Sequence, residues 1–202
     1  MRPIWYKEIV DKYEEKKLSV TFEGGGNRMS FLESQSFFHA WLCQWTFVSC
    51  WHINDVESAA MWRLYAVTSQ AVALQSTYER LRGCLPDAIF TGQIQYLDYE
   101  AGVIPESNTM WPFVHKRMSF SHEQELRALI QNLPVEDDSI AVGKVNPEKG
   151  EPIPVELERL IEKVYVGPSA PAWYADLARK VISRHGLPID VVQSALDASP
   201  IY

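Results

Sequence analysis

The stretch from residue 34 to residue 54 constrains the fold most strongly, because it carries no formal charge. A segment this apolar belongs either in a membrane or in the core of a protein. Several polar side chains interrupt it, and their burial in hydrocarbon would be costly. We therefore expect core structure: a buried helix over residues 30–44 and a strand over residues 46–51, at the centre of a sheet. The interrupting residues are Ser36, His39, Gln44, Thr46 and Ser49.

A length of 202 residues favours one domain, or one domain with an appended lobe, and we expect a single soluble domain over residues 1–202. A content of 47% hydrophobic residues allows a large core and excludes a disordered chain. The net charge of −7 argues against general binding to duplex DNA, which needs a basic footprint. Three cysteines do not make a disulfide framework in a chain this long, and the charged N-terminus is unlike a signal peptide. We expect a cytoplasmic protein that does not insert into membranes.

Strand and helix signals alternate along the chain without a strict βαβ rhythm. The expected class is therefore α+β, a compact domain with a mixed sheet packed with helices. Residues 1–30 are expected to form a variable segment, with a short charged helix to about residue 17 and a glycine break at residues 24–26. Residues 134–151 are acidic and contain glycine and proline, which predicts an exposed connection.

Capping signals place two of the helices. Asn54 or Asp55 is expected to cap a helix that runs to about Tyr65. Ser76 and Glu79 are expected to form a capping box for a short helix that ends at residue 83. The other expected elements are a buried strand over 71–75, a strand over 92–100, a loop over 101–114, and helices over 154–164 and 170–186.

The segment HKRMSFSHEQELRALI, residues 115–130, concentrates charge and allows two structures. As a strand, it would project Glu123, Glu125 and Arg127 from one face, where two repelling carboxylates favour acid–base chemistry. As a helix, Ser121 would cap it and Glu123 would pair with Arg127 one turn later, which is a structural role. The local residues fit the helix slightly better, whereas the neighbouring His-Lys-Arg run favours a functional site.

Polar residues also accompany the apolar helix of ESAAMWRLY, residues 57–65. Its apolar members are expected in the core. Glu57, Ser58 and Tyr65 are candidates for lining a pocket, because polar atoms on a buried face require partners.

Two cysteines and two histidines occur in HAWLCQWTFVSCWH, but their spacing matches no familiar zinc site, so we expect no metal. Cys50 lies in an apolar strand, where burial would raise the pKa of its thiol and make it a poor nucleophile. His52 stands at the end of that strand and is a candidate site residue.

Four segments between residues 46 and 202 resemble a bacterial family of uncharacterised cytosolic proteins, the domain of unknown function twenty-nine seventy-one. They are FVSCWHINDVESAAMWRLY, IQYLDYEAGVIP, PFVHKRMSFSHEQELRALI and VYVGPSAPAWY, with S-C-W-H and K-R-x-x-F-x-x-E-x-E-x-R as shared patterns. The family usually opens with D-x-F-E-G, of which this chain has only TFEGG at residues 21–25. The family has no settled activity, so this resemblance implies an outline and no mechanism.

The Glu-x-Glu pair is also similar to the catalytic motif of arginine-type ADP-ribosyltransferases. In those enzymes an early arginine, a Ser-Thr-Ser strand and a late Glu-x-Glu hold NAD and orient its ribose. This chain has Arg63, Ser76-Thr77 and Glu123-x-Glu125 in that order, although the middle element lacks its third residue and Arg63 falls in an expected helix. The resemblance implies an ADP-ribosyltransferase-like fold with NAD as the candidate cofactor.

Together, these interpretations predict one polar cleft. Its mixed charge suits a nucleotide or an NAD-like molecule, with cationic side chains on the phosphates. The two carboxylates are the candidate catalytic groups, which would hold a ribose hydroxyl or stabilise an oxocarbenium-like centre. The cleft would be lined by His52, Glu57, Ser58 and Tyr65 on one side and by Lys116, Arg117, Glu123, Glu125 and Arg127 on the other.

The leading functional prediction is an enzyme of glycosidic-bond transfer or hydrolysis in a bacterial or phage conflict system. The alternative is a non-catalytic binding or interaction module of a defence or toxin–antitoxin complex, in which the same charges only form ion pairs. A further alternative is an oligomeric scaffold with an apolar patch over residues 37–51.

Overall fold

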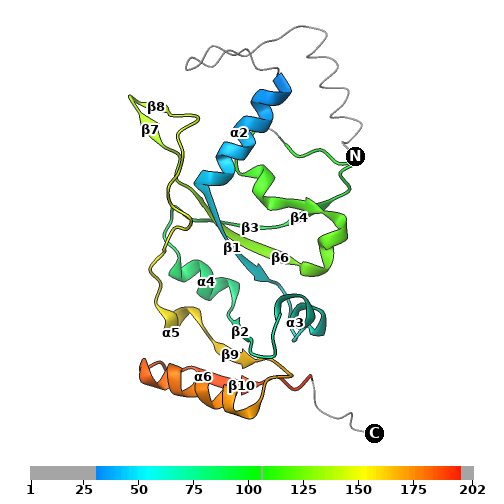
Figure 1. Cartoon of the computed structure of the whole chain (residues 1–202), viewed down its shortest axis with the longest axis vertical. Helices are drawn as coiled ribbons and strands as arrows, with labels where there is room; N and C mark the ends of the chain where they lie inside the picture. The colour runs from blue at the N-terminus through cyan, green and yellow to red at the C-terminus, as the bar shows by residue number, and fades with distance from the viewer. Residues whose placement is uncertain (1–30, 106, 197–202) are drawn as a thin grey trace. The chain divides into compact units, whose positions relative to one another are not determined.

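The computed structural model describes residues 31–105 and 107–196, which form two compact units (Figure 1). Unit 1 combines the chain up to Ile53 with Ala88–Glu151, and unit 2 combines Asn54–Asp87 with the chain from Pro152 onward. The protein has an α+β fold with several small sheets, as predicted. The single-domain prediction stays a prediction. The expected helix to residue 17, the glycine break and the TFEGG segment lie outside the described residues.

Unit 1 is built on an antiparallel sheet with the strand order β1-β6-β3. The predicted helix and strand of the charge-free stretch are confirmed as α2 and β1, which follow each other without a break. Their predicted burial is only partly correct, because Trp41, Leu42 and Thr46 are buried, whereas Phe37 and Val48 are exposed. The predicted central position of this strand is wrong, because among the described strands β6 lies in the middle and β1 at an edge. The bounds are α2 Phe31–Trp45, β1 Thr46–His52, β3 Phe90–Gln93 and β6 Glu125–Gln131.

The core of unit 1 lies against the middle strand. Ile94, Val114 and Leu129 are buried together, and Tyr96 and Trp111 pack against them. The strand expected over residues 92–100 is divided in two at Ile94, whose N–H still donates to the Glu125 carbonyl of β6 at 2.8 Å. The second half pairs in parallel with a short strand. The elements here are β4 Gln95–Leu97, β5 His115–Arg117, and the 3-10 helices η1 Trp111–Val114 and η2 Met118–Glu123.

The connection over residues 134–151 is largely exposed, as predicted, but it also contains a hairpin of β7 Val135–Glu136 and β8 Ser139–Ile140. The turn residues Asp137 and Asp138 have φ values of 48° and 61°, a left-handed pair typical of tight hairpin turns. The indoles of Trp41 and Trp45 donate to the Lys144 carbonyl at 2.8 and 3.1 Å. These bonds anchor the connection to α2.

Unit 2 is a mixed sheet with the order β10-β9-β2, in which β9 and β10 are parallel and β2 is antiparallel to β9. Helix α6 crosses from β9 to β10 and packs on both. Leu160, Val164, Val166 and Ala175 form its buried core. The bounds are α3 Ala59–Tyr65, β2 Val72–Gln75, α4 Tyr78–Cys84, α5 Leu157–Leu160, β9 Lys163–Val166, α6 Ala172–Arg184 and β10 Asp190–Gln193.

Both predicted helix caps in unit 2 are wrong, by three or four residues for α3 and by one residue for α4. Helix α3 is capped by Ser58, whose hydroxyl accepts from the Met61 N–H at 3.3 Å, and not by Asn54 or Asp55. Helix α4 is capped by Thr77, whereas the Ser76 hydroxyl donates to the Leu160 carbonyl at 2.5 Å. In each case the hydroxyl directly before the first helical residue acts as the cap.

Three other predictions in unit 2 need correction. The strand at β2 exists but is exposed and not buried, because it lies at the sheet edge. The helix expected over residues 154–164 is the single turn α5, and the chain then enters β9. Helix α6 is confirmed and is followed by Gly186 at φ +68°, a conformation that favours glycine. Its Asp176 pairs with Arg179 at 2.8 Å and not with the expected Lys180.

Within residues 31–105 and 107–196, no helix is long and apolar enough to cross a membrane.

Candidate functional site

The segment that the sequence left undecided is a short 3-10 helix up to Glu123 and then a strand, and not the expected capped α-helix; the strand alternative is correct only from Glu125 onward. Residues 125–131 form β6, which pairs with β1 on one side and β3 on the other. Glu123 is the last residue of η2, and Gln124 then adopts a left-handed conformation at φ 40°. The helical interpretation is therefore wrong here, and the expected pair of Glu123 with Arg127 is replaced by other partners.

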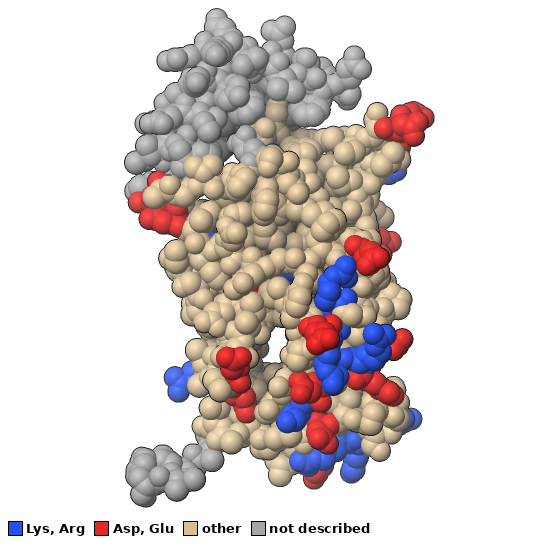
Figure 2. Space-filling view, turned by 180° about the vertical axis from the view of Figure 1, so that it is seen from behind, with Lys and Arg blue, Asp and Glu red and all other residues tan. Residues whose placement is uncertain are grey.

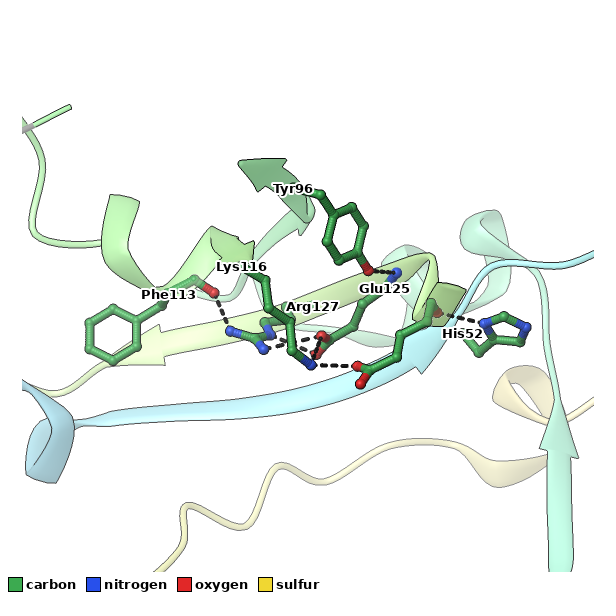
Figure 3. A network of polar contacts seen from close by, with 7 residues as sticks. His52, Tyr96, Phe113, Lys116, Glu125 and Arg127 are labelled. Carbon is green, nitrogen blue, oxygen red and sulfur yellow. Dashed lines mark hydrogen bonds and ion pairs between the residues drawn. The ribbon is translucent and has the colours of Figure 1, made fainter. Parts of the chain in front are cut away.

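Four charged side chains meet beside this strand, and we call them the ion network: Lys116, Glu123, Glu125 and Arg127 (Figure 3). Arg127 holds the Glu125 carboxylate at two points, Nε to Oε1 at 2.7 Å and Nη2 to Oε2 at 3.1 Å. Lys116 Nζ lies 3.2 Å from Glu125 Oε2 and also contacts Glu123 Oε2. The lysine thus bridges two carboxylates that would otherwise repel each other.

The network lies inside unit 1. Glu123 and Glu125 are only 8% and 5% exposed. Backbone groups complete the hydrogen bonding: Arg127 Nη1 donates to the Phe113 carbonyl at 2.6 Å, and the Glu125 N–H donates to the Tyr96 hydroxyl at 2.8 Å. Formal charge is balanced, with two cations facing two carboxylates.

The surroundings of Glu125 fix its ionisation. Burial alone would raise the pKa of this carboxyl group, but hydrogen bonds from Arg127, Cys50 and Lys116 and the positive charge of Arg127 outweigh it. The net result lowers the pKa of Glu125 from 4.5 to about 2. Glu125 is therefore an ionised carboxylate at neutral pH, with no proton to give as a general acid.

The pKa values of Lys116 and Arg127, the partners of Glu125, are raised, which favours their charged forms. Burial opposes the charge of Lys116 and of Arg127, yet the bonds to the carboxylates raise the pKa of both. Cys50 stands opposite Arg127 in the β1–β6 register. Partial burial, and then the bond to Glu125, raise the pKa of the Cys50 thiol, as the sequence predicted. This thiol is exposed but poorly ionised.

His52 comes next to the network from the end of β1. Its Nδ1–H donates to the Glu123 carbonyl at 2.6 Å, because a carbonyl oxygen can only accept. The other ring nitrogen, Nε2, is buried without a hydrogen-bond partner among the described residues. Figure 3 shows the ring turned away from the ammonium and guanidinium groups.

Arg117, the remaining predicted site residue of unit 1, lies outside the ion network. It is exposed, and its guanidinium lies 5.4 Å from the centre of the Tyr99 ring. Of the predicted site residues in unit 1, the structure therefore brings together Lys116, Glu123, Glu125, Arg127 and His52.

The other predicted site residues belong to unit 2. Glu57 Oε2 accepts from the Trp62 indole at 3.1 Å, and the Ser58 hydroxyl caps α3. Tyr65 is 63% exposed. Two of the three thus have local structural roles, and their part in a shared cleft stays a prediction.

The residues matched to the ADP-ribosyltransferase pattern also lie in unit 2, apart from Glu-x-Glu. Arg63 is in the last turn of α3, as the sequence indicated, and Ser76 contacts α5. Among the described residues, no group of three or more His, Cys, Asp and Glu side chains is arranged to hold a metal ion.

Sequence reasoning missed two contributors to the network, Tyr96 and the Phe113 carbonyl. The only sequence signal for Tyr96 is its place in an alternating segment, and a backbone carbonyl gives none. Tyr96 comes from β4, 29 residues before Glu125, and Phe113 comes from η1, 14 residues before Arg127.

In comparisons with protein-family models, curated proteins and solved structures, no match was found.

Proposed function

We propose that the protein is a non-catalytic binding or interaction module, and that the ion network holds unit 1 together. The observation that carries this proposal is the state of Glu125, the residue expected to be catalytic. Its carboxylate is bound at two points by Arg127, contacted by Lys116 and held at a pKa of about 2. Because two cations already balance its negative charge, this ionised carboxylate would stabilise a positive transition state only weakly.

Two of the three cations expected to bind phosphate, Lys116 and Arg127, are already bound to carboxylates, whereas Arg117 is exposed. Arg127 donates from Nε and Nη2 to the Glu125 carboxylate and from Nη1 to the Phe113 carbonyl. The Lys116 ammonium group forms ion pairs with the carboxylates of Glu123 and Glu125. A phosphate would have to displace these buried contacts, which is costly once the partner carboxylate loses its counter-charge.

The charged surface is consistent with contacts to another protein. In Figure 2, positive and negative side chains lie beside one another and do not form a patch of one sign. Unit 2 also carries exposed ion pairs, such as Arg82 with Asp87 and Arg159 with Glu156. Such a surface suits a mixed-charge partner better than a nucleic acid backbone. We place this partner in a bacterial defence or toxin–antitoxin complex in the cytoplasm.

The second candidate is the nucleotide- or NAD-utilising enzyme. One observation favours it: His52 Nε2 is buried without a hydrogen-bond partner among the described residues, and the bond on Nδ1 fixes the orientation of the ring. A polar ligand group would satisfy it. In this candidate, Lys116, Arg117 and Arg127 would bind phosphate, and Glu125, with Glu123, would act on the ribose.

One experiment separates the two functions. Wild type and Glu125→Gln are incubated with NAD and a panel of nucleotides, and NAD consumption and the thermal unfolding temperature are measured. The proposal predicts no NAD loss and no ligand-induced shift for either protein, with Glu125→Gln unfolding at a lower temperature. NAD loss or stabilisation confined to wild type would establish the enzyme and refute the proposal.

A further inference from the structure

Helix α6 has an apolar side that its own sheet does not cover. The helix packs on β9 and β10 (Figure 1), and Ala175 is its buried residue. Leu177 lies about 160° around the helix axis from Ala175, at roughly 100° per residue. Trp173, Leu177 and Val181 are 54%, 46% and 48% exposed. Because they are spaced four residues apart, their side chains form one line along the helix, which we call the α6 row.

A line of charged side chains runs beside the α6 row. Asp176, Lys180 and Arg184 are also spaced four residues apart, and all three are exposed. Asp176 pairs with Arg179 at 2.8 Å, but both side chains are more than half exposed. Such a surface pair is weak and leaves the carboxylate accessible to a second cation. The charged line is therefore negative at its start and positive toward its end, which gives it a direction.

This direction selects the way in which a second α6 fits. Rows spaced by four residues pack into the groove between two such rows of another helix. In an antiparallel pair with two-fold symmetry, Leu177 faces Leu177 of the second copy, and Trp173 faces Val181. Lys180 then lies beside Asp176 of the second copy, and symmetry forms this contact twice. In a parallel pair Lys180 would face Lys180, and like charges opposite each other are unfavourable.

Arg184 adds a contact to the antiparallel pair. It lies one turn beyond Val181, next to the position that Trp173 of the second copy takes. A guanidinium group beside an indole ring gains a cation–π attraction. The ring would also lose its contact with water, which is favourable for so large an apolar surface.

We infer that α6 is a contact surface between two copies of this chain, paired antiparallel across Leu177. A partner for this surface must offer an apolar row flanked by the same charges in the reverse order. A second, antiparallel α6 meets both requirements. The inference goes beyond the proposed function and does not depend on it.

The test is analytical ultracentrifugation of the full chain from about 5 to about 500 μM, a range that covers the weak association of small interfaces. Circular dichroism checks that each variant is folded. Leu177→Glu brings two like charges together on the symmetry axis. Ser183→Glu is the matched control, because it adds the same charge at an exposed position of α6 about 120° from Leu177. Lys180→Glu and Asp176→Lys each reverse one charge, and the double variant exchanges the two.

We expect a monomer–dimer equilibrium for wild type. Leu177→Glu should raise the dissociation constant about tenfold or more, and Ser183→Glu should change it less than about twofold. Each single charge reversal should raise it about fivefold, because symmetry turns two attractive contacts into repulsive ones. The double variant should return to within about twofold of wild type.

A wild type that stays monomeric at every concentration would overturn the inference. So would a dimer that Leu177→Glu leaves intact, because another surface would then hold it together. A double variant that associates no better than the single reversals would overturn the antiparallel pairing. NAD consumption tests the proposed function separately, since it does not depend on association.

Discussion

Arg127 and Glu125, two positions apart on β6, hold each other through a two-point contact inside unit 1, with distances of 2.7 and 3.1 Å. The same guanidinium also binds the Phe113 carbonyl, so the strand is tied to η1 through one side chain. The motif that resembles a catalytic pair therefore also connects β6 to η1. Its consequences are measurable.

Glu125→Gln should destabilise unit 1 by about 3 kcal/mol, because two cations would lose a buried counter-charge. The measure is hydrogen exchange of the β6 amides with and without urea. The matched control is Glu136→Gln, which removes the exposed pair with Lys144. We expect the control to lower the free energy of unfolding by less than about 1 kcal/mol, as for other surface ion pairs. Equal, small effects for both variants would contradict a structural network.

Acid should weaken unit 1 within a defined window. The pKa of Glu125 is lowered on folding from 4.5 to about 2, so its contribution is complete above pH 4.5 and disappears as the pH falls toward 2. At most about 3 kcal/mol is lost over that range by linkage. Unfolding in urea at pH 6, 4, 3 and 2 measures the loss. Glu125→Gln should lose less stability across the same range, and an unchanged slope would contradict the assignment.

Cys50 should respond to the state of Glu125. Burial and the bond to the carboxylate raise the pKa of its thiol, and the charge of Arg127 works in the opposite direction. Removal of the carboxylate in Glu125→Gln should lower the pKa and speed alkylation by iodoacetamide at pH 8. Mass spectrometry of the labelled peptides gives the rate, and the exposed Cys43 serves as the internal control. A Cys50 rate that does not change in the variant would argue against this contact.

Ser58→Ala tests whether this predicted ligand-binding residue is a cap. Loss of the hydroxyl that accepts from the Met61 N–H should destabilise unit 2 by about 1 kcal/mol. Ser58→Asp, which keeps an acceptor at the cap, should restore stability. Hydrogen exchange of the α3 amides measures both. Full stability of Ser58→Ala would mean that the hydroxyl serves another purpose.

Local patterns predicted those elements that local physics determines. Helix α6 has good helix formers and a glycine two residues after its end, and it forms where expected. Its burial was less predictable: Ala175 faces the core, while Trp173, Leu177 and Val181 are about half exposed. Apolar spacing shows that residues share a face, but neighbours far along the chain decide which face is covered.

The undecided segment at β6 shows the same limit. The residues of HEQELRALI satisfy both a capped helix and an alternating strand, so local preference does not separate them. The decision comes from pairing with β1 and β3, which begin about 80 and 35 residues earlier. The charge cluster itself was predictable from composition, because Lys116, Glu123, Glu125 and Arg127 are close in sequence. How these four charges pair with one another, in contrast, depends on side-chain geometry.

The most direct test of the central claim is a titration of the Glu125 carboxyl group by carbon-13 NMR in the intact protein, with Glu125→Gln to assign the signal. The ion network predicts an apparent pKa of about 2, so the signal should stay that of a carboxylate down to about pH 3. A pKa at or above the ordinary 4.5 would contradict the account, because it would describe a carboxyl group that is free to exchange a proton in catalysis.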